Sequence, residues 1–174
     1  MSGRLGVDTR GGRRARSVAV RLLAVLCLGV LGLTASQGLA APAGEQVSIS
    51  AGSADVTGLA YEGPATVGTP AGDVTVLRLV AQTAQLTGFR MRTAGGSHAL
   101  VTTAAGTTRA SGLVLLATEV DATVDGTAVS WTPDAPPPAE PLPNGSGTLS
   151  DLVVHGVVVT AETLRVPGAR QSVE

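Results

Sequence analysis

The sequence predicts an all-β fold: a rolled or sandwiched, mostly antiparallel sheet with glycine corners, placed after an N-terminal signal helix. Residues 47–132 are dense in Val, Thr, Leu and Ala, which favour strands. Glycine-containing turns interrupt this region about every eight to twelve residues, the spacing of an all-β domain. Asp125-Gly126 separates two alternating segments, and this pair accepts the positive φ angles of a type I′ hairpin turn.

The strands follow from the segments between these turns. Gly95-Gly96 and Ala105-Gly106 indicate two further tight connections, so a meander of antiparallel neighbours is expected. The expected strands cover residues 47–50, 54–61, 65–69, 73–79, 82–92, 98–103, 107–117, 119–124 and 127–132, with strand composition returning at 149–166.

A short phrase recurs along the chain. Residues 54–59 read ADVTGL, residues 84–89 read AQLTGF, residues 109–114 read RASGLV, and residues 148–157 repeat the pattern more faintly. The shared pattern is a small residue, a polar residue, an apolar residue, Thr or Ser, and then Gly. This pattern suits a strand that alternates faces and bends at the glycine, where no Cβ obstructs a bulge. Stacked solenoid layers and a rolled or sandwiched sheet both fit this repetition, and the irregular spacing favours the second.

One expected strand lacks a polar face. In residues 74–91 both sides of the alternation carry apolar side chains, and residues 113–120 repeat this pattern. The protein must therefore bury both sides of this strand or present an apolar groove.

The N-terminal region has the composition of an export signal. Six of the twelve arginines fall in the first 21 positions, and residues 22–35 carry no charge. This apolar run is shorter than the roughly 20 residues of a membrane-spanning helix and has the length of a signal-peptide core. Small residues indicate cleavage after Ala40, or next after Ala43.

An uncleaved anchor is the alternative, with the apolar run extended back over residues 18–20 and Arg21 at the membrane interface. The membrane would then be reached only through this N-terminal segment, and both alternatives place the rest of the chain outside the cytoplasm. Cys27 is the only cysteine and lies inside the apolar run, so the processed protein would have no disulfide.

The expected organisation has four parts. Residues 133–147 contain six prolines and are expected to lie extended on the surface, because proline withholds a ladder donor. Residues beyond them either re-enter the sheet or form a small separate unit, and re-entry is favoured because two strands alone are marginal. The parts are a signal peptide at 1–40, the main β domain at 41–132, the proline-rich surface linker at 133–147 and re-entering strands at 148–174.

Charge and composition exclude several classes of partner. From Gly44 onward six arginines face twelve acids, a formal charge of −6 that would repel a phosphate backbone, so no nucleic-acid partner is expected. Tyr61, Phe89 and Trp131 are the whole aromatic set, which disfavours sugar-binding and peptide-binding grooves and makes Phe89 and Trp131 candidate core anchors. A sheet rich in Val, Leu and Ala could hold an acyl chain, so a lipid or an envelope protein is the expected partner. The oligomeric state is left open.

Residues for chemistry are sparse. Neither His98 nor His155 has a carboxylate or a second histidine at the spacing of a metal site, and Ser97 would point to the opposite face of a strand from His98. Asp121 and Asp125 can share one strand face, but Asp125 suits the turn. We therefore predict no enzyme, no catalytic, cofactor-binding or metal-binding residues and no cofactor. His98, Asp121 and Asp125 are the only catalytic nominees.

Two resemblances bear on function. The cadence of ADVTGLAYEGPATVGTPAGDVTVLRLVAQTAQLTG, residues 54–88, resembles the periplasmic lipopolysaccharide-transport bridge family, which implies folded sheets that carry lipid along an apolar trough. The stretch SWTPDAPPP, residues 130–138, resembles small exported actinobacterial proteins of unknown function. A Gram-positive origin would exclude lipopolysaccharide itself and leave other lipids.

Two functional hypotheses follow. The first is an exported, non-enzymatic β-domain, secreted or held in the cell envelope, that binds or shields a lipid-like ligand. The second is an envelope-associated structural or interaction module with a packed core and no ligand.

Overall fold

The computed structural model describes residues 46–69, 72–95, 97–156 and 158–174. These residues belong to one compact unit. The expected signal peptide lies outside the described residues. Within the part of the chain that the structure describes, no helix is long and apolar enough to cross a membrane.

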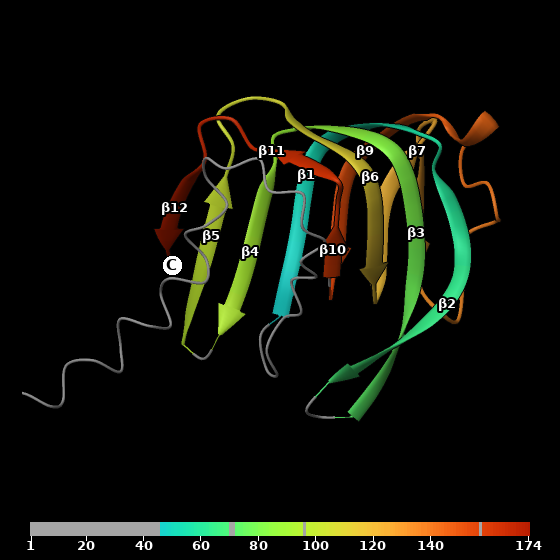
Figure 1. Cartoon of the computed structure of the whole chain (residues 1–174), viewed down its shortest axis with the longest axis horizontal. Helices are drawn as coiled ribbons and strands as arrows, with labels where there is room; N and C mark the ends of the chain where they lie inside the picture. The colour runs from blue at the N-terminus through green and yellow to red at the C-terminus, as the bar shows by residue number, and fades with distance from the viewer. Residues whose placement is uncertain (1–45, 70–71, 96, 157) are drawn as a thin grey trace, which may run out of the picture. The chain divides into compact units, whose positions relative to one another are not determined.

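The described residues form strands almost throughout, which confirms the all-β prediction (Figure 1). Among these residues, a 3-10 turn, η2, occurs at Pro143–Gly145. The expected strand 47–50 joins the start of 54–61 in β1, and 73–79 joins the start of 82–92 in β3, while the ends of 54–61 and 82–92 belong to β2 and β4. The last strand, β12, lies within the expected re-entering region but beyond the strand-like residues 149–166. The strands are β1 Gln46–Thr57, β2 Ala60–Thr69, β3 Gly72–Thr87, β4 Arg90–Gly95, β5 His98–Thr103, β6 Thr108–Ala117, β7 Glu119–Val124, β8 Thr127–Trp131, β9 Gly147–His155, β10 Val158–Thr160, β11 Thr163–Arg165 and β12 Arg170–Val173.

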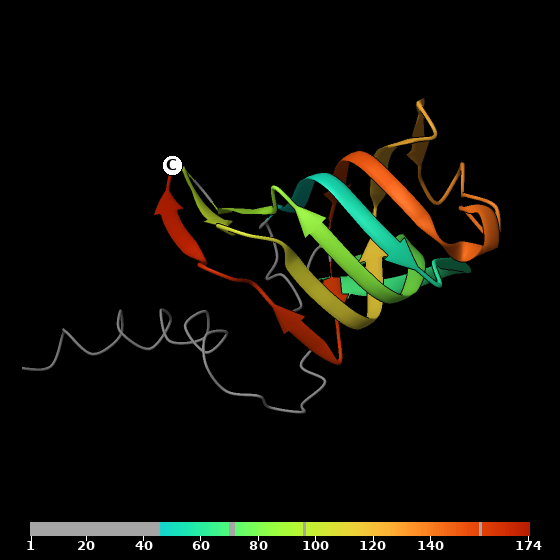
Figure 2. The ribbon, with the colours of Figure 1, turned by 90° about the horizontal axis from the view of Figure 1, so that it is seen from above.

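The long strands hold one twelve-stranded sheet together. One edge of β1 pairs with β9, and the other edge pairs first with β4 and then with β3. In the same way β3 pairs with β2 and β1 on one edge and with β6 on the other, and β9 continues to β7 and β8. Figure 2 shows β1, β3 and β6 running side by side. Every pairing among the described strands is antiparallel, as expected.

The expected meander holds only in part. The consecutive strands β2–β3, β4–β5 and β7–β8 pair as hairpins. The connection through Ala105-Gly106 joins β5 to β6, which pair with different neighbours, so the prediction of a simple meander there is wrong. The sheet is built instead from contacts between distant parts of the chain, above all β1 with β9.

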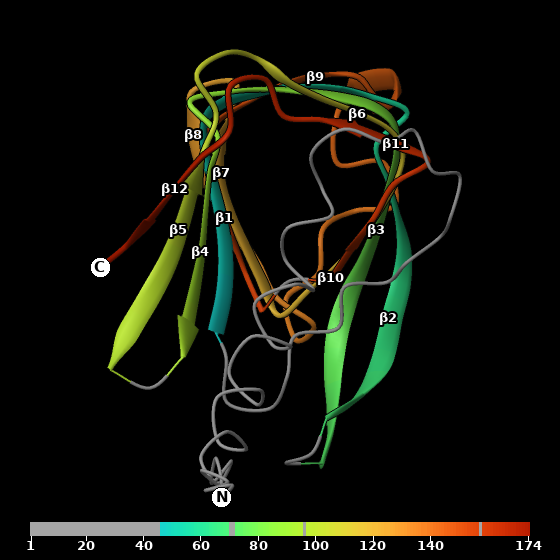
Figure 3. The same cartoon turned by 60° about the vertical axis from the view of Figure 1, so that its left-hand side comes forward.

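The sheet bends so that two walls face each other across the core (Figure 3). Side chains from β3 and β6 and from β7, β8 and β9 belong to one cluster of buried apolar residues. Leu77 and Ala117 are 0% exposed, Val120 is 1% exposed and Val154 is 2% exposed. Trp131 belongs to this cluster, whereas Phe89 is buried outside it.

The glycines of the recurrent phrase bend the chain as predicted. Gly58 follows β1 with a φ of 63°, and Gly88 follows β3 with a φ of 69°. Gly112 lies within β6 at a φ of 58°, where the pairing with β3 passes from Ser111 to Leu113. Positive φ is costly for residues with a Cβ, so glycine is the residue for these corners.

The hairpin prediction at Asp125-Gly126 is also confirmed. Their φ values are 49° and 79°, and Val124 pairs with Thr127 across the turn. Both central residues of a type I′ turn need positive φ. This turn fixes the register of β7 against β8.

Strand β3 buries one face in the core, whereas on its other face Val76 is buried between the exposed residues Val74 and Arg78. Val76 is 3% exposed and the next residue, Leu77, is 0% exposed. Leu77 belongs to the core cluster together with Leu79 and Ala81, which alternate along the same face.

The proline-rich segment is packed as well as exposed. Most of residues 133–147 are exposed, but Leu142 is 3% exposed and belongs to the core cluster. The backbone N–H of Leu59 donates to the carbonyl of Gly145 at 2.7 Å, and the backbone N–H of Tyr61 donates to the carbonyl of Ala139 at 2.9 Å. The expected surface segment therefore also contributes to the core, and β9 directly after it pairs with β1 and β7.

Candidate functional site

The candidate site lies on the outer face of β7 and β9, opposite the core. Val120 on β7 and Val154 on β9 point into the core, so their neighbours Glu119, Asp121 and His155 point outward. This outward orientation of His155 depends on an irregularity in β9. Leu149 and Leu152 are both buried although they are three residues apart, and Asp151 between them has a φ of 51°.

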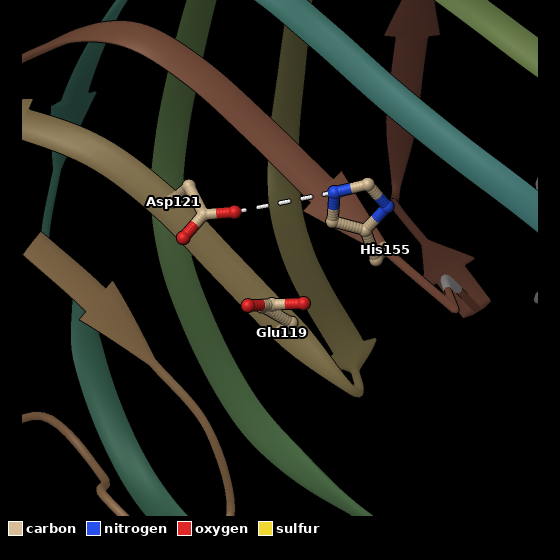
Figure 4. Close-up of side chains that lie close together, drawn as sticks. All are labelled: Glu119, Asp121 and His155. Atoms are coloured by element: carbon tan, nitrogen blue, oxygen red, sulfur yellow. Dashed lines mark ion pairs between the residues drawn. The ribbon is translucent and has the colours of Figure 1, made fainter.

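The strand register brings the three outward side chains together (Figure 4). Glu119 lies directly opposite His155 in the antiparallel pair, and Asp121 follows two residues along β7 on the same face. One potential ligand atom from each residue lies within 4.8 Å of the other two. The Nε2 atom of His155 lies 4.0 Å from Oδ2 of Asp121. We call these three residues the Glu-Asp-His cluster.

The backbone of His155 is held from two sides. Its carbonyl accepts hydrogen bonds from the backbone N–H of Thr118 at 3.0 Å and from the Thr118 hydroxyl at 3.1 Å. The backbone N–H of Gly156 donates to the carbonyl of Val47 at 2.9 Å. The end of β9 is therefore fixed to both neighbouring strands, β7 and β1.

A serine on β8, the strand next to β7, contacts the cluster. Ser130 on β8 lies opposite Asp121, and its hydroxyl donates a hydrogen bond to Oε1 of Glu119 at 3.4 Å. A shallow depression of about 360 Å³ lies beside the cluster, and Asp121, Ser130 and Asp151 contribute to its lining. The cluster is thus accessible from solvent.

The cluster carries two carboxylates without a strong cationic partner. The side chains of His155 and Asp121 are 46% and 41% exposed. Among the described residues, the arginine ion pairs join Arg78 to Glu62 and Arg90 to Glu174, and no arginine pairs with Glu119 or Asp121. Two neighbouring carboxylates without an arginine partner can pair with a protonated imidazole or bind one cation together.

The residues nominated from sequence are dispersed in the structure. Asp121 lies in the cluster, Asp125 is exposed in the β7–β8 turn and His98 is exposed at the start of β5. His155 appeared isolated in the sequence because its partners lie more than thirty residues away on another strand. The Glu-x-Asp spacing at 119 and 121 is the one signal that sequence offered, since residues two apart share a strand face.

Comparisons with protein-family models, with curated proteins and with solved structures find no match to this chain. The two resemblances noted from sequence therefore stay predictions.

Proposed function

We propose that the chain is an exported, non-enzymatic β-domain that acts through its outer surface as an interaction module of the cell envelope. In this proposal the rolled sheet closes on its own side chains and carries no ligand inside. An envelope protein is the natural partner for such a module, and the cationic, apolar leader supports export.

The observation that carries the proposal is the packing of side chains from both walls into one buried apolar cluster. Leu77 and Ala117 on one wall and Val120 on the other are at most 1% exposed and lie in one cluster. Leu142 from the proline-rich segment adds to the same cluster. A trough for an acyl chain would need apolar side chains that line open space, so the burial of these side chains in one cluster favours a module without a ligand inside.

The exposed character of the polar cluster supports a binding role over an enzymatic one. Asp121 and His155 are each more than two-fifths exposed on the face of a sheet. Enzyme sites usually exclude water, because charges act more strongly in a water-poor site. Groups this exposed suit recognition of a partner or an ion.

A lipid-like ligand on the outside of the sheet is the second candidate. On the outer face of β3 and β6 the apolar side chains of Val80 and Val114 lie opposite each other, and Leu116 lies beside them on β6. Val74, near the end of the β2–β3 hairpin, is 37% exposed. Apolar side chains in this position could lie against an acyl chain or an apolar partner.

Lipid analysis of the protein purified from its own cells separates these candidates. Solvent extraction and mass spectrometry should recover less than one lipid per chain if the module proposal is correct. Stoichiometric lipid would overturn it and favour the second candidate. In that case Val74→Asp, a substitution of an exposed residue on the outer face of β3, should lower the recovered lipid, whereas Ala128→Asp, at an exposed position of β8, should not.

A further inference from the structure

We propose that the Glu-Asp-His cluster binds one divalent transition-metal cation, for which Zn²⁺ is the best probe. This inference rests on the outer face of β7 and β9 and is independent of whether the core holds a ligand. Three donor groups of two chemical types converge there from two paired strands.

The spacing of the donor atoms fits a shared ion after a small adjustment. Zinc binds imidazole nitrogen and carboxylate oxygen at about 2.0–2.2 Å, which places two donors of a tetrahedral ion ~3.4 Å apart. The three ligand atoms here lie within 4.8 Å of one another, and His155 Nε2 and Asp121 Oδ2 are 4.0 Å apart. Exposed side chains can close the remaining difference by small rotations, without any movement of the strands.

The donor set selects the class of cation. One imidazole nitrogen with two carboxylate oxygens suits zinc and neighbouring transition metals, whereas Ca²⁺ and Mg²⁺ prefer oxygen donors alone. Three protein ligands leave a fourth position of a tetrahedral ion free for water or for a donor from another molecule. The exposure of Asp121 and His155 gives such a donor access.

Two surrounding features favour the bound state. Ser130 donates to Glu119, the kind of outer hydrogen bond that orients a ligating carboxylate. The depression lined by Asp121, Ser130 and Asp151 opens beside the cluster and brings a third carboxylate near it. A cation would relieve the mutual repulsion of these carboxylates, which no described arginine neutralises.

Zinc titration of the full chain, prepared without a histidine tag, tests the proposal. Competition with a chromophoric chelator should show one zinc ion per chain. His155→Gln, Glu119→Gln and Asp121→Asn should each weaken binding by at least about tenfold, since loss of even an outer-shell group costs about 10–100-fold. Ser130→Ala should weaken it less than any of these three.

His98→Gln and Asp125→Asn are matched controls, because they remove an exposed histidine and an exposed acid outside the cluster. Both should leave zinc affinity unchanged. The chain has two histidines, so the imidazole NMR signals are simple to assign with the His98→Gln variant, and zinc should shift the signals of His155 alone. This NMR measurement keeps Glu119, Asp121 and His155 unchanged, so it does not depend on whether a variant of the Glu-Asp-His cluster folds.

The proposal is overturned by a zinc dissociation constant weaker than about 1 mM, or by zinc that shifts the His98 signals in place of those of His155. Equal loss of affinity in His98→Gln and His155→Gln would also overturn it. Circular dichroism and thermal unfolding without metal should match the unsubstituted chain for each variant, so that lost affinity reports on the ligands.

Discussion

The two faces of the β7–β9 pair differ completely although they share the same backbone. On the inner face Val120 and Val154 are at most 2% exposed, and on the outer face Asp121 and His155 are more than 40% exposed. The alternation of a strand separates these two sets. Stability should therefore depend on the inner face and ion binding on the outer face, so substitutions can change one property without the other.

The largest effect should come from the inner face of β9. Leu152 is 8% exposed and belongs to the core cluster, so Leu152→Ala removes buried apolar surface and leaves a cavity. We expect the free energy of unfolding to fall by about 2–5 kcal/mol. Urea denaturation measures this change, and a loss below that of an exposed substitution would show that the interior is not packed as described.

The next effect concerns the corners that allow the sheet to fold over its core. Gly88 has a φ of 69°, and a Cβ there would lie 3.4 Å from the backbone nitrogen of Gly52. Gly88→Ala should lower the free energy of unfolding by about 1–2 kcal/mol, the cost of a left-handed conformation.

Gly52→Ala is the matched control for this prediction. Its added Cβ would meet its nearest atom, the carbonyl oxygen of Thr87, at an ordinary 3.7 Å, and no positive φ is required. Thermal unfolding of the two variants should therefore differ. Equal effects would contradict the account of the corner glycine.

An ion pair on the outer face should matter less. Arg90 on β4 donates to Glu174 at 2.8 Å, and their side chains are 45% and 50% exposed. Solvent and salt screen such pairs, so Glu174→Gln should cost about 0.2–1 kcal/mol. The cost should shrink in high salt, and urea denaturation at two salt concentrations measures it; a salt-independent cost would contradict the assignment to charge.

The smallest effect on stability should come from the cluster itself. Glu119→Gln keeps the shape of an outward side chain and removes one charge, so without metal the free energy of unfolding should change by less than about 0.5 kcal/mol. Zinc should raise the melting temperature of the unsubstituted chain, because a ligand bound only to the folded state stabilises it. Zinc should raise the melting temperature of the Glu119→Gln variant less. An equal rise in the variant and the unsubstituted chain would show that the ion binds elsewhere.

Local features of this fold were predictable from sequence, whereas the assembly of the sheet was not. The Asp125-Gly126 turn and the phrase glycines follow from backbone sterics, which act within a few residues. The sharing of one edge of β1 between β3 and β4 depends on partners far along the chain. No local pattern encodes such a pairing.

The candidate site shows the same division. The outward spacing of Glu119 and Asp121 could be read from alternation, but the position of His155 could not. It required the register between β7 and β9 and the irregularity at Asp151, which changes the face on which the end of β9 points. The burial of Leu142 within a proline-rich segment could not be predicted for a similar reason, since only the folded sheet forms the core in which it is buried.

The proposed division between a ligand-free interior and an ion-binding exterior can be tested directly by native mass spectrometry of the chain isolated from its own cells. Before metal is added, the folded species should have the mass of the polypeptide, with no bound lipid. Addition of Zn²⁺ should then shift it by the mass of one zinc ion. A lipid adduct on every chain, or a zinc-free spectrum at saturating metal, would contradict this account.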